Sequence, residues 1–266
     1  MFLERILESK RIEVAERAVQ TPLETLKRRA AEAPDPRELV AALRRPGLGV
    51  IAEVKRASPS KGPLRPDLDA PALARLYEEG GCTAISVLTD GPHFGARPDD
   101  LPAVRGAVSV PVLRKDFLIA DYQLWEARAM GADAVLLIVA ALDLETLARF
   151  IGVAGGLGMT ALVEVHTAEE VKVALECGAR VVGINNRDLH SFRVDLGVTR
   201  RLRPLVPAGV AVVAESGISG PADAAALREL GVDAVLVGEA LVTAEDPAAM
   251  VRAISSGAGR APVEAP

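Results

Sequence analysis

Eight short apolar runs alternate with segments of helical periodicity, and this alternation limits the fold more than any other feature of the chain. The runs are rich in valine, isoleucine, leucine and alanine, and they occupy 49–53, 83–88, 110–114, 134–139, 160–165, 180–184, 210–214 and 234–237. Between them, apolar residues recur at helical spacing in 71–80, 121–131, 143–156, 168–178 and 221–231. Strands that alternate with helices predict parallel pairing with right-handed crossovers. Eight such units predict closure into a (β/α)8 barrel.

A doubly wound open sheet is the rival fold for the same alternation. That fold usually carries Gly-x-Gly-x-x-Gly directly after its first strand, whereas the first run here leads into Ser58-Pro-Ser-Lys-Gly62. Gly131, Gly178 and Gly231 each stand between a helical segment and the next run, where a glycine supplies the left-handed cap that ends a helix. The pattern therefore favours an α/β fold of the barrel type.

The 266 residues fit one barrel domain with additions at both ends. Residues 1–46 precede the first strand, and the segments 4–19, 23–33 and 36–43 predict three helices that pack on the barrel or cover one of its ends. The barrel itself is predicted to occupy 47–254. The remaining residues, 255–266, are small, polar and rich in proline and glycine, which predicts a disordered tail.

Charge and composition argue against several classes of protein. The formal net charge is −5 and no basic stripe appears, so the electrostatic footprint of a nucleic-acid binder is missing. No uninterrupted run of ~20 apolar residues predicts a membrane span, and charges interrupt the N-terminus too often for a signal peptide. Cys82 and Cys177 lie far apart, which favours two thiols in a reducing compartment, and no Cys/His cluster has zinc-ligand spacing. The expected location is the cytoplasm, with no metal, membrane or nucleic-acid partner.

Charged residues at the C-terminal ends of the runs are the candidates for catalysis, because barrel enzymes carry their active sites there. Glu53 and Lys55 end the first run, and the period of two along a strand places both on one face. A buried ion pair is the alternative, although such a pair contributes little net stability. Lys115 ends the third run, where a lysine offers a tunable pKa that arginine lacks. A solvated surface lysine is the alternative at that position.

The fifth and sixth runs end in further polar candidates. Glu164 interrupts an apolar run and is a candidate general base, whereas His166 is expected just outside the site on the following loop. Asn185 and Asn186 are the only asparagines in the chain, so a pair at a strand end indicates specific hydrogen bonding, with a turn as the alternative. Arg187 offers a fork for a carboxylate.

Small residues follow the last two runs. Ser216 and Gly217 come after the seventh run, and Gly238 with Glu239 comes after the eighth. Barrels commonly bind phosphate at this point, where backbone N–H groups at a helix start surround the anion. The two neighbouring motifs together predict a phosphate site.

These pieces together resemble the indole-3-glycerol phosphate synthase family. The matching segments are Ile51-Ala-Glu-Val-Lys-Arg-Ala-Ser-Pro-Ser60, Val112-Leu-Arg-Lys-Asp-Phe117, Val163-Glu-Val-His166, Gly183-Ile-Asn-Asn-Arg-Asp-Leu189, Ala214-Glu-Ser-Gly-Ile218 and Val237-Gly238. The resemblance extends from the N-terminal helix to about residue 254. It implies a carboxy-lyase of tryptophan biosynthesis that needs no cofactor or metal. Such an enzyme converts 1-(2-carboxyphenylamino)-1-deoxyribulose 5-phosphate to indole-3-glycerol phosphate, CO2 and water.

The resemblance also implies a role for each candidate residue. Lys115 matches the general acid for ring closure, Glu164 the base, and Lys55, paired with Glu53, a second acid; which lysine acts in which step is left open. Asn185 and Arg187 match positions that hold the substrate carboxylate and polar groups. The implied phosphate site comprises Ser216, Gly217 and Gly238, with Lys55 or Ser58 nearby. The implied pocket for the aromatic ring comprises Phe94, Phe117, Leu136 and Leu189, for which packing at the barrel mouth is the bland alternative.

One position departs from the family. Some members carry a small hydroxyl residue where this chain has Glu239, and a carboxylate beside a phosphate would repel it. We therefore expect only the backbone N–H of Glu239 to contribute, with the side chain turned to solvent. The polar segment 58–64 is expected to be a mobile loop that closes over the substrate.

Other functions remain as alternatives. Phosphoribosylanthranilate isomerase and the tryptophan synthase α subunit are also phosphate-binding barrels, but neither needs Glu53, Lys55, Lys115 and Glu164 together. A non-catalytic phosphosugar-binding barrel, or a structural subunit, could keep the phosphate motif without these acids and bases. The chain is expected to act as a monomer or weak homodimer.

Overall fold

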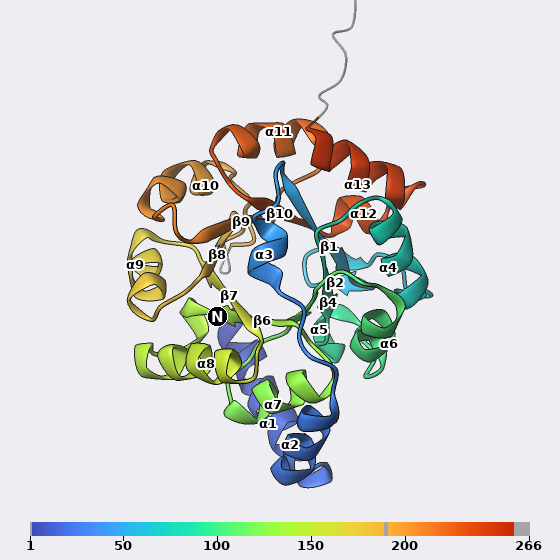
Figure 1. Ribbon diagram of the computed structural model, residues 1–266, viewed down its shortest axis with the longest axis vertical. Helices are drawn as coiled ribbons and strands as arrows, with labels where there is room; N and C mark the ends of the chain where they lie inside the picture. The colour runs from blue at the N-terminus through green and yellow to red at the C-terminus, as the bar shows by residue number, and fades with distance from the viewer. Residues whose placement is uncertain (1, 189–190, 258–266) are drawn as a thin grey trace, which may run out of the picture.

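Eight parallel strands close into a barrel at the centre of the molecule (Figure 1), and this confirms the predicted (β/α)8 fold. The computed structural model describes residues 2–188 and 191–257. The last strand pairs with the first in parallel, with Gly49 opposite Ala234. Each predicted run forms a strand whose ends differ by at most two residues from the prediction. In chain order, the strands are β1 (Gly49–Val54), β4 (Ala84–Leu88), β5 (Val112–Lys115), β6 (Ala134–Ile138), β7 (Thr160–Val165), β8 (Val181–Asn185), β9 (Ala211–Glu215) and β10 (Ala234–Val237).

Helices surround the barrel, and their ends follow from local sequence. Asp69, Asp143, Thr167 and Asp246 each cap a helix start by accepting a hydrogen bond from a backbone N–H. The glycines predicted to end helices do so in the left-handed region; Gly131, for example, has φ +86°. The outer helices are α4 (Ala70–Glu79), α6 (Asp100–Ala107), α7 (Asp121–Ala129), α8 (Leu144–Gly156), α9 (Ala168–Glu176), α10 (Gly197–Leu202), α11 (Pro221–Glu229) and α13 (Pro247–Ser256).

Short elements occupy several of the loops. The segment after β1 carries a small hairpin in which Ala57 pairs with Pro63. None of the described helices is long and apolar enough to cross a membrane. The short elements are β2 (Ala57–Ser58), β3 (Gly62–Pro63), α5 (Gly91–Phe94), η1 (Val139–Ala141), η2 (Arg203–Leu205) and α12 (Glu239–Val242).

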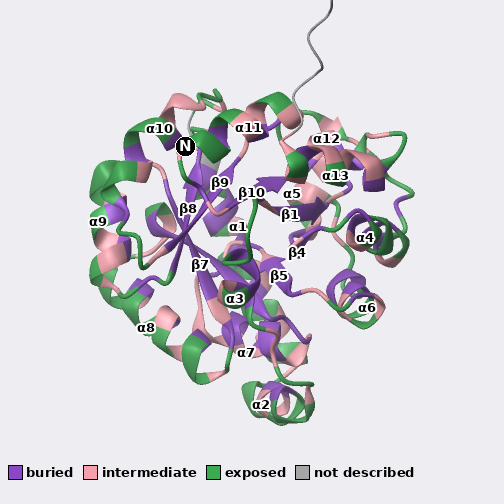
Figure 2. Cartoon of the chain, turned by 45° about the horizontal axis from the view of Figure 1, so that its top comes forward, coloured by how far each residue is buried: buried purple, intermediate pink, exposed green. Residues whose placement is uncertain are grey.

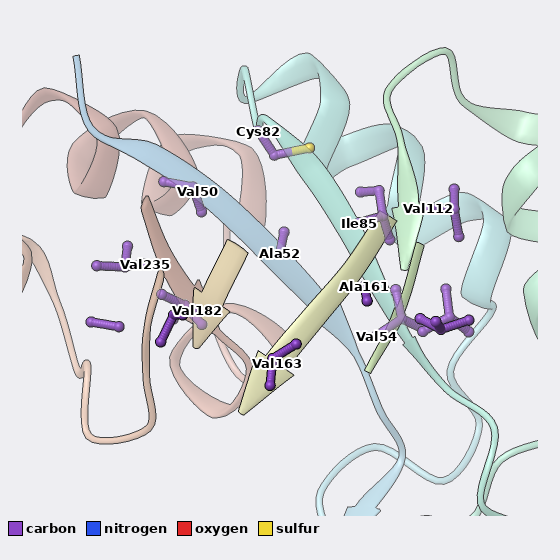
Figure 3. Packing of buried hydrophobic residues seen from close by; sticks show 14 of the residues in the cluster. Val50, Ala52, Val54, Cys82, Ile85, Val112, Ala161, Val163, Val182 and Val235 are labelled. Atoms are coloured by element: carbon purple, nitrogen blue, oxygen red, sulfur yellow. The ribbon is translucent and has the colours of Figure 1, made fainter. Parts of the chain in front are cut away.

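The apolar residues form two separate layers. Val50, Ala52 and Val54 of β1 point outward and pack with the helices, and Figure 3 shows part of this outer cluster. Ile51 points the other way, into a smaller cluster inside the barrel. Because side chains alternate along a strand, Glu53 continues the inward series of Ile51 toward the barrel mouth. The strands are buried almost throughout, whereas the helices expose their outer faces (Figure 2).

The N-terminal extension covers both ends of the barrel, although the sequence predicted a cover for one. Leu39 and Leu43 of α3 (Leu39–Leu43) join the inner cluster beside Ala84 and Ala234 at the strand starts, so α3 closes the N-terminal end. At the other end, Lys10 of α1 (Phe2–Gln20) reaches residues that follow β4 and β5. Between these two helices, α2 (Leu23–Glu32) packs on α7.

Two boundaries differ from the predicted ones. The third helix begins at Leu39, not at residue 36, because residues 34–38 are held out of helical conformation. The backbone N–H of Arg37 donates to Asp133, and its guanidinium donates to the Val110 carbonyl, which ties this segment to the base of the barrel. At the other end of the chain, α13 continues to Ser256, so the predicted tail begins later. Residues 258–266 of that tail lie outside the described residues.

Candidate active site

A cavity of about 410 Å³ opens at the C-terminal ends of the strands. It is the place where barrel enzymes carry their catalytic groups. Leu189, one of the predicted ring-pocket residues, lies outside the described residues. Every other predicted site residue lines the cavity: Glu53, Lys55, Ser58, Phe94, Lys115, Phe117, Leu136, Glu164, Asn185, Arg187, Ser216, Gly217, Gly238 and Glu239.

Glu53 lies between the two predicted catalytic lysines. The Nζ atom of Lys55 is 2.8 Å from Glu53 Oε1, and Nζ of Lys115 is 3.9 Å from Glu53 Oε2. Lys115 Nζ is also 3.9 Å from Glu215 Oε2. Lys55 therefore makes a close ion pair, whereas Lys115 stands at a longer distance between two carboxyl groups and faces the cavity.

These charges keep Lys115 protonated. Burial alone would lower the pKa of Lys115, but the charges of Glu53, Glu215 and Glu164 outweigh burial and raise it. Burial would also raise the pKa of Glu53, and there the positive charges of Lys55 and Lys115 win and lower it. The site thus presents a fixed ammonium group and an ionised carboxylate at neutral pH. The tunable pKa expected of Lys115 is shifted upward.

Glu215 is a site residue that the sequence reasoning missed. It ends β9, is 1% exposed and lines the cavity. No hydrogen bond of normal geometry reaches its carboxyl oxygens within the described residues. Burial raises the pKa of Glu215 well above its usual value, and the negative charges of Glu164 and Glu53 raise it further against the effect of Lys115. Glu215 is therefore a neutral carboxyl group that can donate a proton.

The sequence did contain a signal for Glu215. Like Glu164, Glu215 places a carboxyl at the end of an apolar run, but the residues after it had been interpreted only as a phosphate motif. The neighbouring strand makes room for this side chain, since a Cβ at Gly183 would overlap the Glu215 carboxyl. That glycine in the middle of β8 is a second signal.

Glu164 has a neighbour that the sequence placed elsewhere. Glu164 is 2% exposed and lines the cavity as predicted. His166 does follow the end of β7, but its ring turns back, so that Nε2 lies 3.5 Å from Glu164 Oε1. The expectation that His166 lies just outside the site is correct for its backbone and wrong for its side chain, which contacts the candidate base from behind.

The two asparagines have different surroundings. Asn185 lines the cavity, and its Oδ1 accepts from the backbone N–H of Arg187 at 3.0 Å. Asn186 points away and ties three segments together, since its Nδ2 donates to the Glu215 carbonyl while its Oδ1 accepts from both the backbone and the hydroxyl of Thr199. Asn185 thus remains a candidate for substrate contact, whereas Asn186 holds β8, β9 and α10 together.

Phe192 is a second residue that the sequence reasoning missed. Its ring lines the cavity beside Arg187, whose Nη1 donates to the Phe192 carbonyl at 3.2 Å. Phe192 has φ 58°, a conformation that a bulky side chain rarely adopts. Such strain is often found at functional sites. No local sequence signal marks this aromatic residue, since it lies in a loop.

The predicted phosphate motifs lie on adjacent strands. Ser216 has φ 63° and Gly217 has φ 81°, so two successive residues take the left-handed conformation at the cavity wall. A Cβ at Gly217 would overlap Val194, and one at Gly238 would overlap the charged ends of Glu53 and Lys55. Both glycines therefore permit a close approach of backbone that a larger residue would prevent.

Glu239 begins α12 and points outward. Its side chain is 44% exposed, as the sequence reasoning expected. Its Oε1 lies 3.2 Å from Nζ of Lys61, a residue of the loop that carries the β2–β3 hairpin. This pair connects the predicted mobile loop to the phosphate end of the cavity. The mobility itself stays a prediction.

No metal site is present in the part of the chain that the structure describes, since no group of three or more His, Cys, Asp or Glu side chains is arranged to hold an ion. The cavity instead combines ammonium groups, carboxyl groups and exposed backbone at one end with apolar side chains at the other. Phe94, Phe117 and Leu136 belong to this apolar part. The arrangement suits proton transfer on a ligand that has an aromatic end and an anionic end.

Comparison with known proteins gives one consistent family. The sequence matches the family model described as indole-3-glycerol phosphate synthase over residues 3–254. The indole-3-glycerol phosphate synthase of Mycobacteroides abscessus is 54% identical over 245 residues, which cover 92% of this chain and 90% of that protein. The enzyme of the same name from Streptomyces griseus is 51% identical over 249 residues, which cover 94% of this chain and 93% of that protein.

Solved structures with lower sequence identity share the fold. The 3-hexulose-6-phosphate synthase of Salmonella typhimurium superposes with a TM-score of 0.63 at 17% identity and covers 79% of this chain and 98% of its own. The thiamine phosphate pyrophosphorylase of Pyrococcus furiosus gives a TM-score of 0.62 at 21% identity, with 83% of this chain and 97% of its own covered. At this identity the likeness shows the barrel alone.

Proposed function

Because this chain belongs to the indole-3-glycerol phosphate synthase family, we propose a division of the reaction among the residues around its cavity. The enzyme is a carboxy-lyase of tryptophan biosynthesis. It converts 1-(2-carboxyphenylamino)-1-deoxyribulose 5-phosphate to indole-3-glycerol phosphate, CO2 and water. The assignment of individual residues to the steps of this reaction is the subject of the proposal.

Lys115 is the acid for ring closure. When the ring carbon that bears the carboxylate attacks the ketose carbonyl, negative charge develops on the carbonyl oxygen. A positioned ammonium group stabilises that charge and donates the proton that the oxygen needs. The observation that carries this assignment is the place of Lys115 Nζ, which faces the cavity at 3.9 Å from both Glu53 and Glu215. At that distance the ammonium is held in place but keeps donors available for a substrate oxygen.

Glu164 is the base and Lys55 the second acid. After CO2 leaves, dehydration removes the hydroxyl group with a proton from an acid, and a base takes the remaining proton to complete the indole. Glu164 lies deep in the cavity wall, as a base on a buried substrate must. Lys55 approaches so closely to Gly238 that it belongs to the phosphate side of the cavity. The neutral carboxyl of Glu215 provides a further proton donor beside Lys115.

The remaining lining residues hold the substrate. Backbone N–H groups at Ser216, Gly217 and Gly238 bind the phosphate, because successive left-handed residues turn their N–H groups toward one side. Arg187 and Asn185 hold the carboxylate, and Arg187 offers the planar fork that suits this group. The aromatic ring packs against the apolar wall formed by Phe94, Phe117, Leu136 and Phe192.

Single-turnover kinetics with two readouts test the division between the lysines. Release of CO2 reports ring closure with decarboxylation, and indole fluorescence reports dehydration. We expect Lys115→Ala to abolish both signals while substrate still binds. We expect Lys55→Ala to release CO2 faster than indole fluorescence appears. CO2 release by Lys115→Ala at the wild-type rate would exclude Lys115 as the closure acid, and loss of CO2 release in Lys55→Ala alone would exchange the two roles.

The chain is proposed to act in the cytoplasm as a monomer or weak homodimer, without a nucleic-acid or membrane partner. Support for a reducing compartment comes from Cys82 and Cys177, which are both free thiols. Light scattering during gel filtration over a range of protein concentrations tests the oligomeric state. A stable mass well above 27.9 kDa at every concentration would contradict the proposal.

A further inference from the structure

His166 lies between two carboxylates behind the cavity wall. Its Nε2 is 3.5 Å from Oε1 of Glu164, and its Nδ1 is 3.3 Å from Oε2 of Glu170. The side chain is 13% exposed and does not line the cavity, so it reaches the candidate base without reaching the space for substrate. His166 is therefore placed to act on Glu164 and not on the ligand.

The ring orientation is set by the start of α9. Oε2 of Glu170 also accepts from the backbone N–H of His166 at 2.6 Å, and the backbone N–H of Glu170 donates to Oγ1 of the capping residue Thr167 at 3.1 Å. These bonds hold the Glu170 carboxylate and, through it, one edge of the imidazole. The opposite edge is then aimed at Glu164. Its Nε2 is buried and has no hydrogen bond of normal geometry within the described residues.

The charges around the ring favour the imidazolium form. Burial alone would lower the pKa of His166 below its ordinary value of 6.5. The hydrogen bond with Glu170 and the negative charges of Glu164, Glu170 and Asp188 outweigh burial and raise the pKa. These acids come from β7, from α9 and from the loop after β8, so negative charge faces the ring from each of these segments.

We propose that His166 is a positioning residue for Glu164, and that its imidazolium form keeps the Glu164 carboxylate ionised and fixed in direction. The inference rests on the proposed role of Glu164 as the base. Without the positive charge, Glu164 would have on one side the carboxyl of Glu215 and on the other an uncharged ring. A buried carboxylate in such surroundings holds a proton more tightly and cannot accept another.

The proposal predicts a defect that depends on pH. An opposite charge within ~4–6 Å moves a carboxyl titration by roughly 1–3 pH units. In His166→Gln, we therefore expect the acid limb of the kcat profile to move up by about one pH unit or more. Near about pH 6, kcat should fall about tenfold relative to wild type. The two enzymes should converge at alkaline pH, where the wild-type imidazole has lost its proton.

Two further variants sharpen the kinetic test. Glu170→Gln leaves the imidazole in place but removes one charge that favours its protonation, so it should give a smaller defect of the same pH dependence. His93→Gln is the matched control, because His93 Nδ1 lies 3.0 Å from Asp90, at a distance from Glu164. Its ratio to wild type should not vary with pH. A ratio for His166→Gln that is constant with pH, or a defect in KM alone, would overturn the proposal.

A titration followed by NMR tests the ion pair without any turnover. The chain has three histidines, so the imidazole signals can be assigned by single substitutions. We expect the pKa of His166 to lie above 6.5 in wild type and to fall in Glu164→Gln and in Glu170→Gln. An unchanged titration of His166 in Glu164→Gln would show that the pair does not exist. If Glu164→Gln itself turned over normally, the proposed base would be wrong, whatever the histidine titration showed.

Discussion

Two buried clusters of charge lie on opposite sides of the same short stretch of chain. Lys115 points into the barrel mouth, whereas its neighbours Arg114 and Asp116 point outward beneath α1 and α7. The mouth cluster comprises Glu53, Lys55, Lys115, Glu164 and Glu215. The support cluster comprises Lys10, Asp90, Arg114, Asp116 and Glu126. Both clusters consist of ions taken out of water, but they are completed in different ways.

The support cluster is saturated. Nζ of Lys10 lies 2.8 Å from Asp90 and 2.9 Å from Asp116, and Arg114 lies 2.7 Å from Glu126. Asp116 also accepts from the Thr89 hydroxyl at 2.8 Å. Such a set of short contacts compensates the cost of burial and leaves little capacity for another partner. Its role is to fasten α1 to the loops after β4 and β5, one of which carries Lys115.

The mouth cluster is incomplete by comparison. Lys115 approaches its two acids only to 3.9 Å, and the oxygens of Glu215 have no hydrogen bond of normal geometry in the described chain. Three glutamates and two lysines would give −3 + 2 = −1, and the neutral form of Glu215 brings this sum to zero. The difference teaches that buried charges stabilise a fold when saturated and remain available to a ligand when not.

Substitution of one glutamate in each cluster should break this comparison most strongly. We expect Glu164→Gln to lower kcat by about 10²–10⁴-fold with little change in stability, because it removes a general base from an unsaturated site. Glu126→Gln is the matched control, since Glu126 contacts Arg114 at 2.7 Å and Arg17 at 3.2 Å in the support cluster. It should lower the free energy of unfolding and largely preserve kcat. Indole fluorescence and urea unfolding measure the two effects, and similar kcat values for both variants would contradict the distinction.

Lys10→Met should have the largest effect on stability. The substitution leaves Asp90 and part of Asp116 buried without their positive partner, and loss of one member of a buried ion pair costs about 3–5 kcal/mol. Urea unfolding of the variant measures this loss. Lys27→Met is the control, because Lys27 pairs with Glu24 at 2.7 Å on the surface. An exposed pair contributes at most about 1 kcal/mol. Equal losses in both variants would mean that the buried cluster has no special weight.

Lys10 also marks the limit of what the sequence could reveal. Strand alternation predicted the barrel, and the period of two predicted the inward side of Glu53 and Lys55, because both signals are local. Lys10 stands among charged residues in the first helix and looks like a solvent-exposed lysine. Its burial depends on the docking of α1 against loops some 80 and 106 residues further along the chain, namely those of Asp90 and Asp116. No periodicity within α1 encodes that contact.

The candidate site shows the same division. Lys115 and Glu164 could be predicted because each places a charge where an apolar run ends, at the edge where barrels carry catalysis. Glu215 gives the same signal, but a phosphate motif directly after it attracted a different interpretation. The ring of His166 and the strained backbone of Phe192 depend on contacts between loops. Only the folded chain brings these groups to the cavity or to the residues that line it.

Acid should weaken the support cluster through Asp116. Burial would raise the pKa of Asp116, but Arg114 and Lys10 lower it from 3.8 to about 2. A carboxyl with a lowered pKa in the folded state stabilises the protein above its unfolded pKa, and this contribution disappears as pH falls through the folded pKa. Between about pH 5 and pH 2, Asp116 should therefore cost the fold about 2 kcal/mol. The difference in unfolding free energy between wild type and Asp116→Asn should shrink over this range, and a constant difference would exclude this linkage.

The smallest expected effect is at Glu239, where the mouth cluster meets solvent. The Glu239 side chain is 44% exposed and pairs with Lys61, which is 59% exposed, so salt and water screen both charges. Glu239→Ser removes a negative charge near the proposed phosphate site, and KM should fall by about two- to threefold with kcat nearly unchanged. The gain should fade at high salt. Glu229→Ser, an exposed glutamate at the end of α11, should leave KM unchanged. A higher KM in Glu239→Ser would mean that the Lys61 pair, which holds the loop, outweighs the repulsion of the phosphate.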